Sequence, residues 1–570
     1  MEVESSSSSS PSRGDGHHEP EDQSSRKKKR GGWRAVKYIL GNESFEKLAS
    51  MSLIANLTVY LQNKYNIGGV FLVNIVTIWS GLSNISAVAG AFVSDAYLGR
   101  FWTLLLGSIA SFLGMGMMAL TAALPKLRPR NCSNERSECP KPEPLQLVAL
   151  FTGLGLLALG AGGVRPCNIA FGADQFDTNT PKGKAQLETF FNWWYFSFTV
   201  ALVIALTGVV YIQSNISWFI GFLIPTACLL LSITIFLFGR HTYICAKPQG
   251  SVFSDMFKVV AAALRKRKVK ISDDVTFYDA PLDQPGSSTR LLGTDRLGFL
   301  DKASIVMDPN EINEEGRPRN DWRLCSLQQV KNLKCVLGVL PVWVAGIACF
   351  MLMDQQNTFG ILQAIQMDKS IGPHFRIPPG WMNLVSMVAL SAWILAYECI
   401  CIPATRFITG RNRRLTIKQR IEIGIVMGIA CMVVAGFLEK KRRASALRNG
   451  SFVSSISVLL LLPQFALSGL MEAFSCVALM EFLTMRMPEH MRTVAGAIFF
   501  LSSSMASYIS TLLVDVIHNV TSRGGKSPWL GGRDLNKNRL EYYYFIIGAI
   551  EFVNLMYFRF FAGRFASENI

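Results

Sequence analysis

The chain has 570 residues, of which 50% are hydrophobic and only 17% are charged, and its formal net charge at pH 7 is +17. This composition excludes an ordinary soluble globular protein and is typical of a membrane protein with many spans. The positive charge does not indicate a nucleic-acid partner, because the basic residues are spread over several loops and no nucleic-acid-binding motif surrounds them. Contact with anionic lipid of the inner leaflet is the more economical interpretation.

Apolar stretches of about 20 residues, the length that crosses a hydrocarbon core of roughly 30 Å, follow one another along the chain. Lipid supplies no hydrogen-bond partner for the backbone, so such long apolar runs favour helices over barrel strands. Twelve spans are predicted, at residues 38–61, 70–94, 101–124, 145–166, 188–211, 216–238, 334–359, 380–403, 419–438, 455–483, 493–516 and 541–562. The expected fold class is therefore an all-α membrane protein.

The predicted spans form two sets of six, separated by a long polar stretch. We expect a disordered cytoplasmic tail at 1–30, an N-terminal bundle at 31–238, a cytoplasmic linker with an amphipathic helix at 239–333, a C-terminal bundle at 334–562 and a tail at 563–570. Basic residues before the first span, in the linker and between the eighth and ninth spans predict that both termini are cytoplasmic. The basic run 440–443, which follows the ninth span, breaks this rule.

The loops assigned to the opposite side carry the features expected of a face within the secretory pathway. Glycosylation sequons begin at Asn131, Asn449 and Asn519, all in loops on that side. Cys132 and Cys139 share the first of these loops, and the sequence leaves a disulfide and two free thiols equally open. The other ten cysteines lie mostly in or beside apolar spans without metal-ligand spacing, so no metal site is expected.

Three charged residues lie inside the first span: Glu43, Glu46 and Lys47. A charge in a membrane helix costs about 2.5 to 3.5 kcal/mol on insertion scales, so such residues indicate a transport or proton pathway. Their spacing places all three on one helix face, where a Glu43–Lys47 ion pair would leave Glu46 able to bind and release a proton. The alternative is a span that begins at Ala49, but only 13 residues would then remain to Leu61.

Two further charges at membrane depth come from different halves of the chain, Arg165 in the fourth span and Glu472 in the tenth. An acid and a base at this depth need each other or water, so they could form either a transport pair or a permanent structural pair. A polar insertion at residues 353–357 interrupts the seventh span, and its amides could bind sugar hydroxyl groups. The residues expected to line a substrate cavity are Tyr60, Met353, Gln355, Gln356 and Trp381, although the two aromatic residues could instead be interface anchors.

The run Gly90-Ala-Phe-Val-Ser-Asp95-Ala-Tyr-Leu-Gly99-Arg100 follows the second span. It resembles the signature loop of the major facilitator superfamily, in which an acid and a base pair at the cytoplasmic end of the bundle. That resemblance gives Asp95 and Arg100 the role of a cytoplasmic gate. It also implies two six-helix bundles that rock about a site at the membrane midplane.

Three more specific runs narrow the family: Glu43-x-x-Glu46-Lys47, Phe171-Gly-Ala-Asp-Gln-Phe176 and Phe190-Phe-Asn-Trp-Trp-Tyr195. Together they resemble the plant nitrate and peptide transporter family, part of the proton-dependent oligopeptide transporters, over roughly residues 31 to 562. The runs 32–36 and 162–168 are similar to the subgroup that includes nitrate, glucosinolate and flavonol glycoside carriers.

This resemblance implies roles for single residues. It makes Glu43, Glu46 and Lys47 the proton-coupling group and predicts that Arg165 and Glu472 meet across the cavity. The family commonly has Arg where this chain has Lys47, and Lys lacks the bidentate fork of Arg. Met353 occupies the position of the nitrate-binding histidine in the family's best-known nitrate carrier, which weakens the case for nitrate.

No ATP-binding or hydrolase motif is present in the sequence, so an enzyme is not expected and a proton gradient is the expected energy source, without a cofactor. The predicted function is a proton-coupled symporter that moves a glycosylated specialised metabolite, of the glucosinolate or flavonoid glycoside type, or another organic anion. The alternatives are a low-affinity nitrate transporter and a transporter-like nutrient sensor. The expected partners are a small-molecule substrate, protons and lipid, in the plasma membrane or alternatively the vacuolar membrane.

Overall fold

The computed structural model describes residues 31–130, 132, 139–176, 180–245, 252–268, 277–278, 297–308, 311–313, 316–373, 375–397, 400, 415–488, 491–523 and 528–567. The predicted tail at 1–30, the sequon residue Asn131 and much of the predicted linker lie outside these residues. Within the predicted C-terminal tail, residues Gly563–Ser567 form the short helix α17.

The described residues form twelve helical rods, and each coincides with one predicted span. The rods are α1 (Trp33–Lys64), α2 (Gly69–Val93), α3 (Gly99–Ala123), α4 (Pro144–Ala173), α5 (Pro181–Ile204), α6 (Trp218–Phe238), α8 (Leu327–Gln355) continuing into α9 (Ile361–Ile365), α10 (Trp381–Ala396), α12 (Ile417–Arg448), α13 (Leu462–Met471) with α14 (Val477–Arg486), α15 (Arg492–Thr521) and α16 (Leu540–Tyr557). The predicted all-α membrane fold is therefore confirmed. The described residues also include a short linker helix, α7 (Val252–Arg265), and a two-stranded hairpin formed by β1 (Ser370–Ile371) and β2 (Phe375–Arg376).

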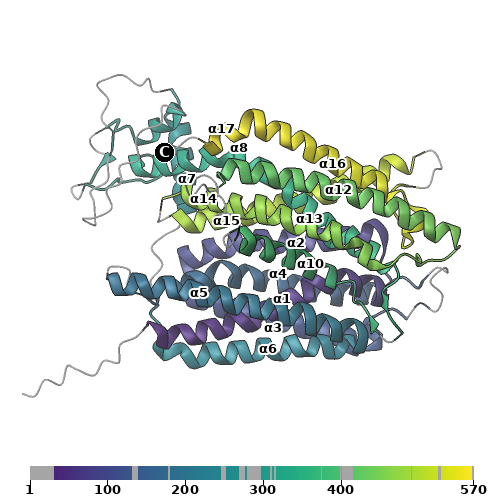
Figure 1. The fold of residues 1–570 in the computed structure, drawn as a ribbon. Helices are drawn as coiled ribbons and strands as arrows, with labels where there is room; N and C mark the ends of the chain where they lie inside the picture. The colour runs from purple at the N-terminus through teal and green to yellow at the C-terminus, as the bar shows by residue number, and fades with distance from the viewer. Residues whose placement is uncertain are drawn as a thin grey trace, which may run out of the picture.

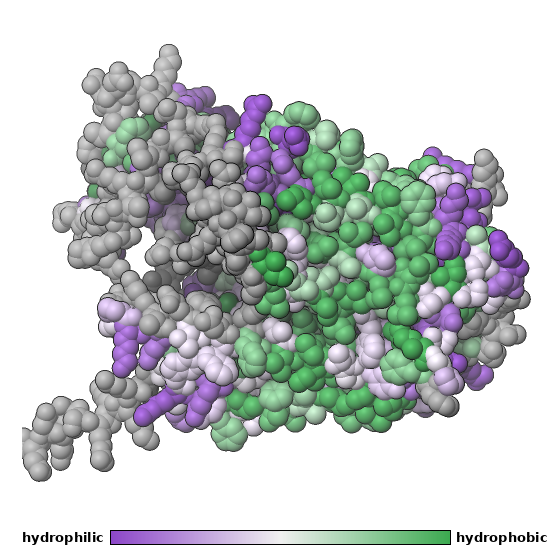
Figure 2. Space-filling view, viewed as in Figure 1, coloured by the Kyte–Doolittle hydropathy of each residue, from purple (hydrophilic) through white to green (hydrophobic). Residues whose placement is uncertain are grey.

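Length and composition alone identify nine segments of the described chain as able to cross a membrane. One of these, Gly69–Ala123, holds both α2 and α3, so the nine segments account for ten rods. The other two are α1, which carries the charged turn and many buried polar side chains, and α10, which has only 16 residues. Figure 2 shows the resulting surface, in which apolar side chains cover the middle of the molecule and hydrophilic ones gather towards its ends.

Local sequence signals explain where several rods begin. Capping boxes start α4, α8 and α12, where the side chains of Glu143, Ser326 and Thr416 accept a hydrogen bond from the backbone three residues on. Short π-helical turns interrupt the rods at η1 (Ser94–Leu98), η3 (Ala205–Val209), η4 (Ile212–Ile216), η8 (Gln356–Gly360), η11 (Glu472–Cys476) and η14 (Phe558–Ala562). Such turns insert one extra residue into a helix and are frequent at functional sites.

The rods form two halves that lie against each other. Figure 1 shows α1 to α6 in the lower half of the molecule and α12 to α16 in the upper half. Within the lower half, α2 and α4 touch through their backbones, because a Cβ atom added to Gly90 would lie 1.9 Å from the carbonyl oxygen of Gly162. Such close approach allows helices to associate without a hydrophobic driving force.

The two ends of the bundle differ in what they carry. The described chain begins and ends at one end, here called the proximal end, together with α7 and α17 (Figure 1). The opposite, distal end carries the turn between α1 and α2, the end of α12 and the segment 528–539 that precedes α16. A disulfide joins Cys132 and Cys139 at the distal end, which resolves the choice between a disulfide and free thiols.

The halves are joined along α2 and α15 towards the distal end. Asn74 Nδ2 donates to Asp515 Oδ1 at 2.7 Å, the hydroxyl groups of Thr77 and Thr511 lie 2.6 Å apart, and Ser504 Oγ donates to the carbonyl of Gly81 at 2.9 Å. Asn84 Nδ2 donates to Ser503 Oγ at 3.0 Å. Asn74 and Thr77 lie in the distal part of α2, Gly81 lies at its middle and Asn84 lies beyond it, so the halves touch from the distal part of α2 past its midpoint and this conformation is closed at the distal end.

Candidate functional site

The charged turn of α1 is buried and compact. Lys47 Nζ lies 3.7 Å from Glu43 Oε1 and 3.8 Å from Glu46 Oε2. Both carboxylates are almost fully buried, each residue being 2% exposed. Lys47 is therefore shared nearly equally between the two acids, whereas the sequence suggested a pair with Glu43 that leaves Glu46 aside. A single point charge between two buried carboxylates balances only one of them.

Neighbouring polar groups complete the surroundings of this turn. Asn168 of α4 donates a hydrogen bond from Nδ2 to Glu43 Oε2. Ser50 Oγ donates to Glu46 Oε1 at 2.5 Å, while Glu46 Oε2 accepts no hydrogen bond from the described residues. An oxygen that lacks a donor in a buried site is a position where a proton can be held. The turn thus contains two buried carboxylates that share one cation, and Asn168 connects it to α4.

A cavity of about 150 Å³, lined by both apolar and polar residues, lies between the two halves. Its polar lining comes from both sides: Thr77, Ser80, Ser83 and Asn84 of α2 and Arg165 of α4 face Asp354 of α8 and Asn357 and Thr358 of η8. Trp79 also lines it, with its indole N–H donated to the carbonyl of Leu154 at 2.9 Å. Hydroxyl and amide groups, one guanidinium and one carboxylate are therefore available to a bound solute.

Arg165 is held in this cavity by Asn84 of the same half, and Asn84 in turn bonds to the other half. Its Nη1 donates to Asn84 Oδ1 at 2.8 Å, and the amide nitrogen of Asn84 donates to Ser503 Oγ. Arg165 also interacts electrostatically with Glu46 of the charged turn. The cavity guanidinium is thus connected both to the charged turn of α1 and, through Asn84, to the contact between the halves.

Asp354 lines the cavity; it belongs to the predicted polar insertion 353–357 but was not selected as a site residue from the sequence. Ser507 Oγ of α15 donates to Asp354 Oδ2 at 2.8 Å, and no ion pair links Asp354 to a cation among the described residues. The signal was present in the sequence, because Asp354 is an acid within an apolar span, which is a functional-site hypothesis by default.

The three predicted cavity residues of α8 and η8 lie elsewhere. Gln355 Oε1 accepts from the hydroxyl of Tyr543 at 2.8 Å, and Gln356 Oε1 accepts from Gln464 Nε2 at 2.8 Å, so both bind within the C-terminal half. Met353 Sδ lies 3.8 Å from Cys476 Sγ. Side chains at positions i, i+3 and i+4 share a helix face, so Asp354, Asn357 and Thr358 point into the cavity together. The three predicted residues project from other faces of the helix.

The two predicted aromatic residues pack against other rings and are not among the described residues that line the cavity. Tyr60 is fully buried in the N-terminal half, where its hydroxyl lies 2.9 Å from Thr121 Oγ1 and its ring contacts Trp218 at 5.0 Å between centroids. Trp381 begins α10 and packs near Phe375 of β2, with centroids 5.8 Å apart. Both therefore contribute to packing in this conformation.

Glu472 lies in the π turn η11, on the rod formed by α13 and α14. No ion pair within 4.0 Å joins it to Arg165 in the described part of the chain, where Arg165 binds Asn84 instead. The transport pair between these two residues stays a prediction, for a conformation other than this one.

The motif after α2 forms a cluster of three charges at the proximal end. Arg100 Nε lies 3.8 Å from Asp95 Oδ1, and Arg100 Nη1 lies 2.6 Å from Asp174 Oδ1 at the end of α4. The sequence selected Asp95 and Arg100, and the structure adds Asp174, which belongs to the quoted run 171–176. Arg100 of α3 therefore links η1, which follows α2, to the end of α4.

Two halves built from twelve described rods, a cavity with polar side chains between them and charges at membrane depth define a secondary transporter of the major facilitator type. The sequence profile of the POT family matches residues 101–530, and the chain belongs to this family of proton-coupled transporters. Among the described residues, no group of three or more His, Cys, Asp or Glu side chains could hold a metal ion.

Curated relatives and solved structures agree with this assignment. NRT1/PTR family protein 2.8 of Arabidopsis thaliana is 70% identical over 541 residues, which cover 95% of this chain and 96% of that protein. NRT1/PTR family protein 2.13 of the same plant is 41% identical over 535 residues, covering 93% and 86%. The crystal structure of the POT family transporter PepTSo has a TM-score of 0.68 at 18% identity, covering 94% of this chain and 99% of that one. The predicted family is therefore confirmed, and the protein is a multi-pass membrane transporter rather than an enzyme.

Proposed function

We propose that this transporter is a symporter that uses protons to move a glycosylated specialised metabolite, of the glucosinolate or flavonoid glycoside type, or another organic anion. The observation that carries the proposal is the lining of the central cavity. Six hydroxyl or amide side chains surround a single guanidinium in this space: Thr77, Ser80, Ser83, Asn84, Asn357 and Thr358 around Arg165. Hydroxyl-rich sugars need many donors and acceptors, and an anionic group on the substrate would bind the guanidinium.

The connection between Arg165 and the charged turn of α1 supports the proposed proton coupling. Arg165 and Asn168 are three residues apart on α4, so they share a face, and Asn168 binds Glu43. When Glu43 or Glu46 takes up a proton, the electrostatic potential at Arg165 changes. The strength of the Arg165–Asn84 hydrogen bond then changes too, and with it the affinity of Arg165 for a substrate anion. Substrate and proton would then be carried in the same cycle of alternating access.

The size of the cavity supports a second candidate, a low-affinity nitrate transporter. A volume of about 150 Å³ is below the roughly 300 Å³ at which sites for drug-sized ligands begin. A compact anion could therefore bind beside Arg165 without rearrangement, whereas a glycoside requires the halves to move apart. Met353, which occupies the position of the family's nitrate-binding histidine, is not among the described residues that line this space, so nitrate would depend on Arg165 alone.

Uptake in oocytes distinguishes these candidates. We would record accumulation and inward current at pH 5.5 and 7.5 for nitrate, a dipeptide, a glucosinolate and a flavonol glycoside, with water-injected oocytes as the control. Accumulation of a glycoside with an inward current at the lower pH supports the first proposal, and nitrate alone supports the second. No accumulation and no current for any of the four would refute both. The plasma membrane is the proposed location, with the vacuolar membrane as the alternative, and a fluorescent fusion in plant cells separates them.

A further inference from the structure

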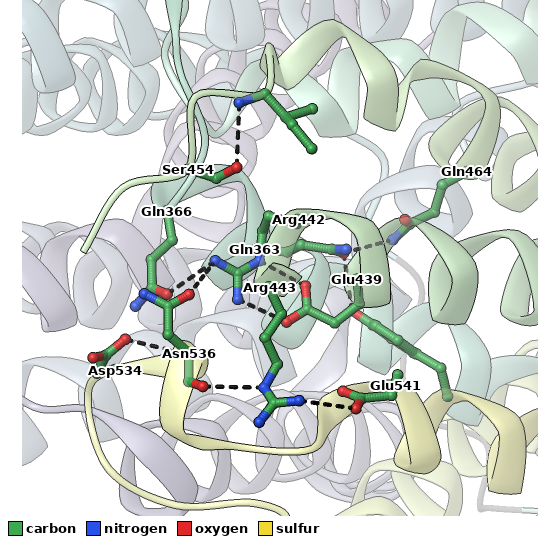
Figure 3. Close-up of polar contacts among 12 residues, drawn as sticks. Gln363, Gln366, Glu439, Arg442, Arg443, Ser454, Gln464, Asp534, Asn536 and Glu541 are labelled. Atoms are coloured by element: carbon green, nitrogen blue, oxygen red, sulfur yellow. Dashed lines mark hydrogen bonds and ion pairs between the residues drawn. The ribbon is translucent and has the colours of Figure 1, made fainter. Parts of the chain in front are cut away.

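The basic run after the ninth span, which breaks the positive-inside rule, contributes two arginines to a polar network at the distal end, with Arg442 buried and Arg443 partly buried (Figure 3). Arg442 forms a bidentate ion pair with Glu439, with Nε to Oε2 and Nη2 to Oε1 both at 2.7 Å. Both residues are 0% exposed. In a buried pair of this kind, the N–H groups of Arg442 that do not bind Glu439 also need acceptors. The residues that supply these acceptors therefore show which part of the chain the pair holds in place.

The remaining nitrogen of Arg442 binds the segment 528–539, which connects α15 to α16. Arg442 Nη1 donates to Asn536 Oδ1 at 2.8 Å, and Asn536 Nδ2 donates to the carbonyl of Phe452 at 3.0 Å. The neighbouring Arg443 donates from Nε to the backbone carbonyl of Asn536 at 3.0 Å and pairs with Glu541 at 3.4 Å. Side chain and backbone of Asn536 are therefore both fixed to the end of α12.

A second attachment holds the same segment a few residues earlier. Gln366, which follows α9, donates from Nε2 to the carbonyl of Arg533 at 3.0 Å, and its Oε1 lies 3.4 Å from Arg442 Nη1. In Figure 3, Gln366 and Asn536 approach the same guanidinium. The segment is thus fastened to two different rods of the C-terminal half.

The side of segment 528–539 that faces away from α12 contacts the N-terminal half at the start of α2. Gly69 begins α2 with φ at +64°, and a Cβ atom placed on it would lie 2.5 Å from the backbone nitrogen of Gly532. A Cβ atom on Gly68 would lie 2.8 Å from the Cα atom of Arg533, and Arg533 also contacts Cys139 of the disulfide loop. The two halves therefore meet here backbone to backbone, directly at the distal mouth.

We propose that Asn536, together with the buried Glu439–Arg442 pair, is a positioning residue that holds segment 528–539 as a stopper against the turn between α1 and α2. A loop fixed at both Asn536 and Arg533 keeps its shape when the halves rock. It closes the distal side in this conformation, and in the conformation that is open on the distal side it moves away together with the C-terminal half. This inference concerns the conformational cycle and does not depend on which substrate the cavity takes.

The test measures access to the cavity from the distal side. Ser80→Cys places a thiol in the cavity lining, and labelling by a membrane-impermeant maleimide is followed in intact oocytes, with the chain lacking that change as background. Asn536→Ala in the Ser80→Cys chain removes the side-chain attachment and leaves the Glu439–Arg442 pair in place. We expect at least a threefold increase in the labelling rate, normalised to surface protein. Lys537→Ala, an exposed residue of the same segment, is the matched control and should label like Ser80→Cys alone.

A second variant reaches the same contact from the other half. Gly69→Ala puts a methyl group against the backbone of Gly532, so it should also raise the labelling rate at least threefold. It serves as the deciding measurement if the Asn536→Ala chain does not reach the surface. Labelling rates equal to that of Lys537→Ala, in whichever of the two variants is expressed at the surface, would overturn the proposal.

Discussion

Replacement of Asp354 by Asn tests the charge balance of the cavity. The amide has the same shape and can still accept the hydrogen bond that Ser507 donates to Asp354 at 2.8 Å. The substitution therefore removes a negative charge with little change in packing. Because Asp354 and Arg165 line the same space, the carboxylate repels any substrate anion that binds the guanidinium. We expect Asp354→Asn to lower the KM for an anionic substrate.

The size of the effect follows from the cavity volume. A roughly spherical space of 150 Å³ is about 7 Å across, so substrate and carboxylate charges are separated by about that distance. Two unit charges about 7 Å apart interact by about 2.4 kcal/mol at an effective dielectric constant of about 20 and by about 0.6 kcal/mol in water. These limits correspond to an affinity change of about 3-fold to about 60-fold.

The assay compares two substrates of similar bulk and different charge. Uptake of a sulfated glucosinolate and of a neutral flavonol glycoside is measured over a range of concentrations in oocytes that express either chain at matched surface levels. The KM of the charged substrate should fall and that of the neutral substrate should stay within about twofold, since the Coulomb term is absent for a neutral solute. An unchanged KM for the charged substrate would refute the reasoning, because Asp354 would then carry no charge that the substrate feels.

Three further substitutions address coupling and packing. Glu472→Gln should abolish proton-driven uptake while surface expression is kept, and full uptake with the original pH dependence would exclude the role. Lys47→Arg should bring the number of charges moved per substrate molecule closer to a fixed value, because a guanidinium can bind both carboxylates that share Lys47. Current recorded together with tracer uptake measures this number. Gly90→Ala should lower the melting temperature in detergent, since overpacking costs about 1 to 3 kcal/mol, whereas Gly155→Ala, which meets nothing within 4 Å, should not; equal melting temperatures would contradict the packing argument.

The helical rods were predictable because their signal is local. A long apolar run reveals a membrane helix without reference to other parts of the chain, and the shared face of Glu43, Glu46 and Lys47 follows from helical spacing alone. Contacts between rods are not encoded in this way. The equal sharing of Lys47 by two acids and the bond from Arg165 to Asn84 depend on how α1, α2 and α4 pack.

The apparent exception to the positive-inside rule has a physical explanation that requires the folded structure. Arg442 is neutralised by Glu439 within its own helix, and Arg443 pairs with Glu541 of α16. α12 continues to Arg448, ten residues beyond the predicted end of the ninth span at residue 438. Two of the four basic residues of the run are therefore structural parts of the distal end rather than charges that report topology.

The π turns of the rods have a consequence for how related proteins are compared. An α-helix advances by about 100° for each residue, so the one extra residue of a π turn rotates everything beyond it by about that angle. Such turns occur at Gln356–Gly360, in the cavity wall, and at Glu472–Cys476. Deletion of one residue there would act as a rotation and present a different set of side chains to the substrate. A comparison of cavity residues between related transporters should therefore first establish whether both chains have the extra residue at these turns.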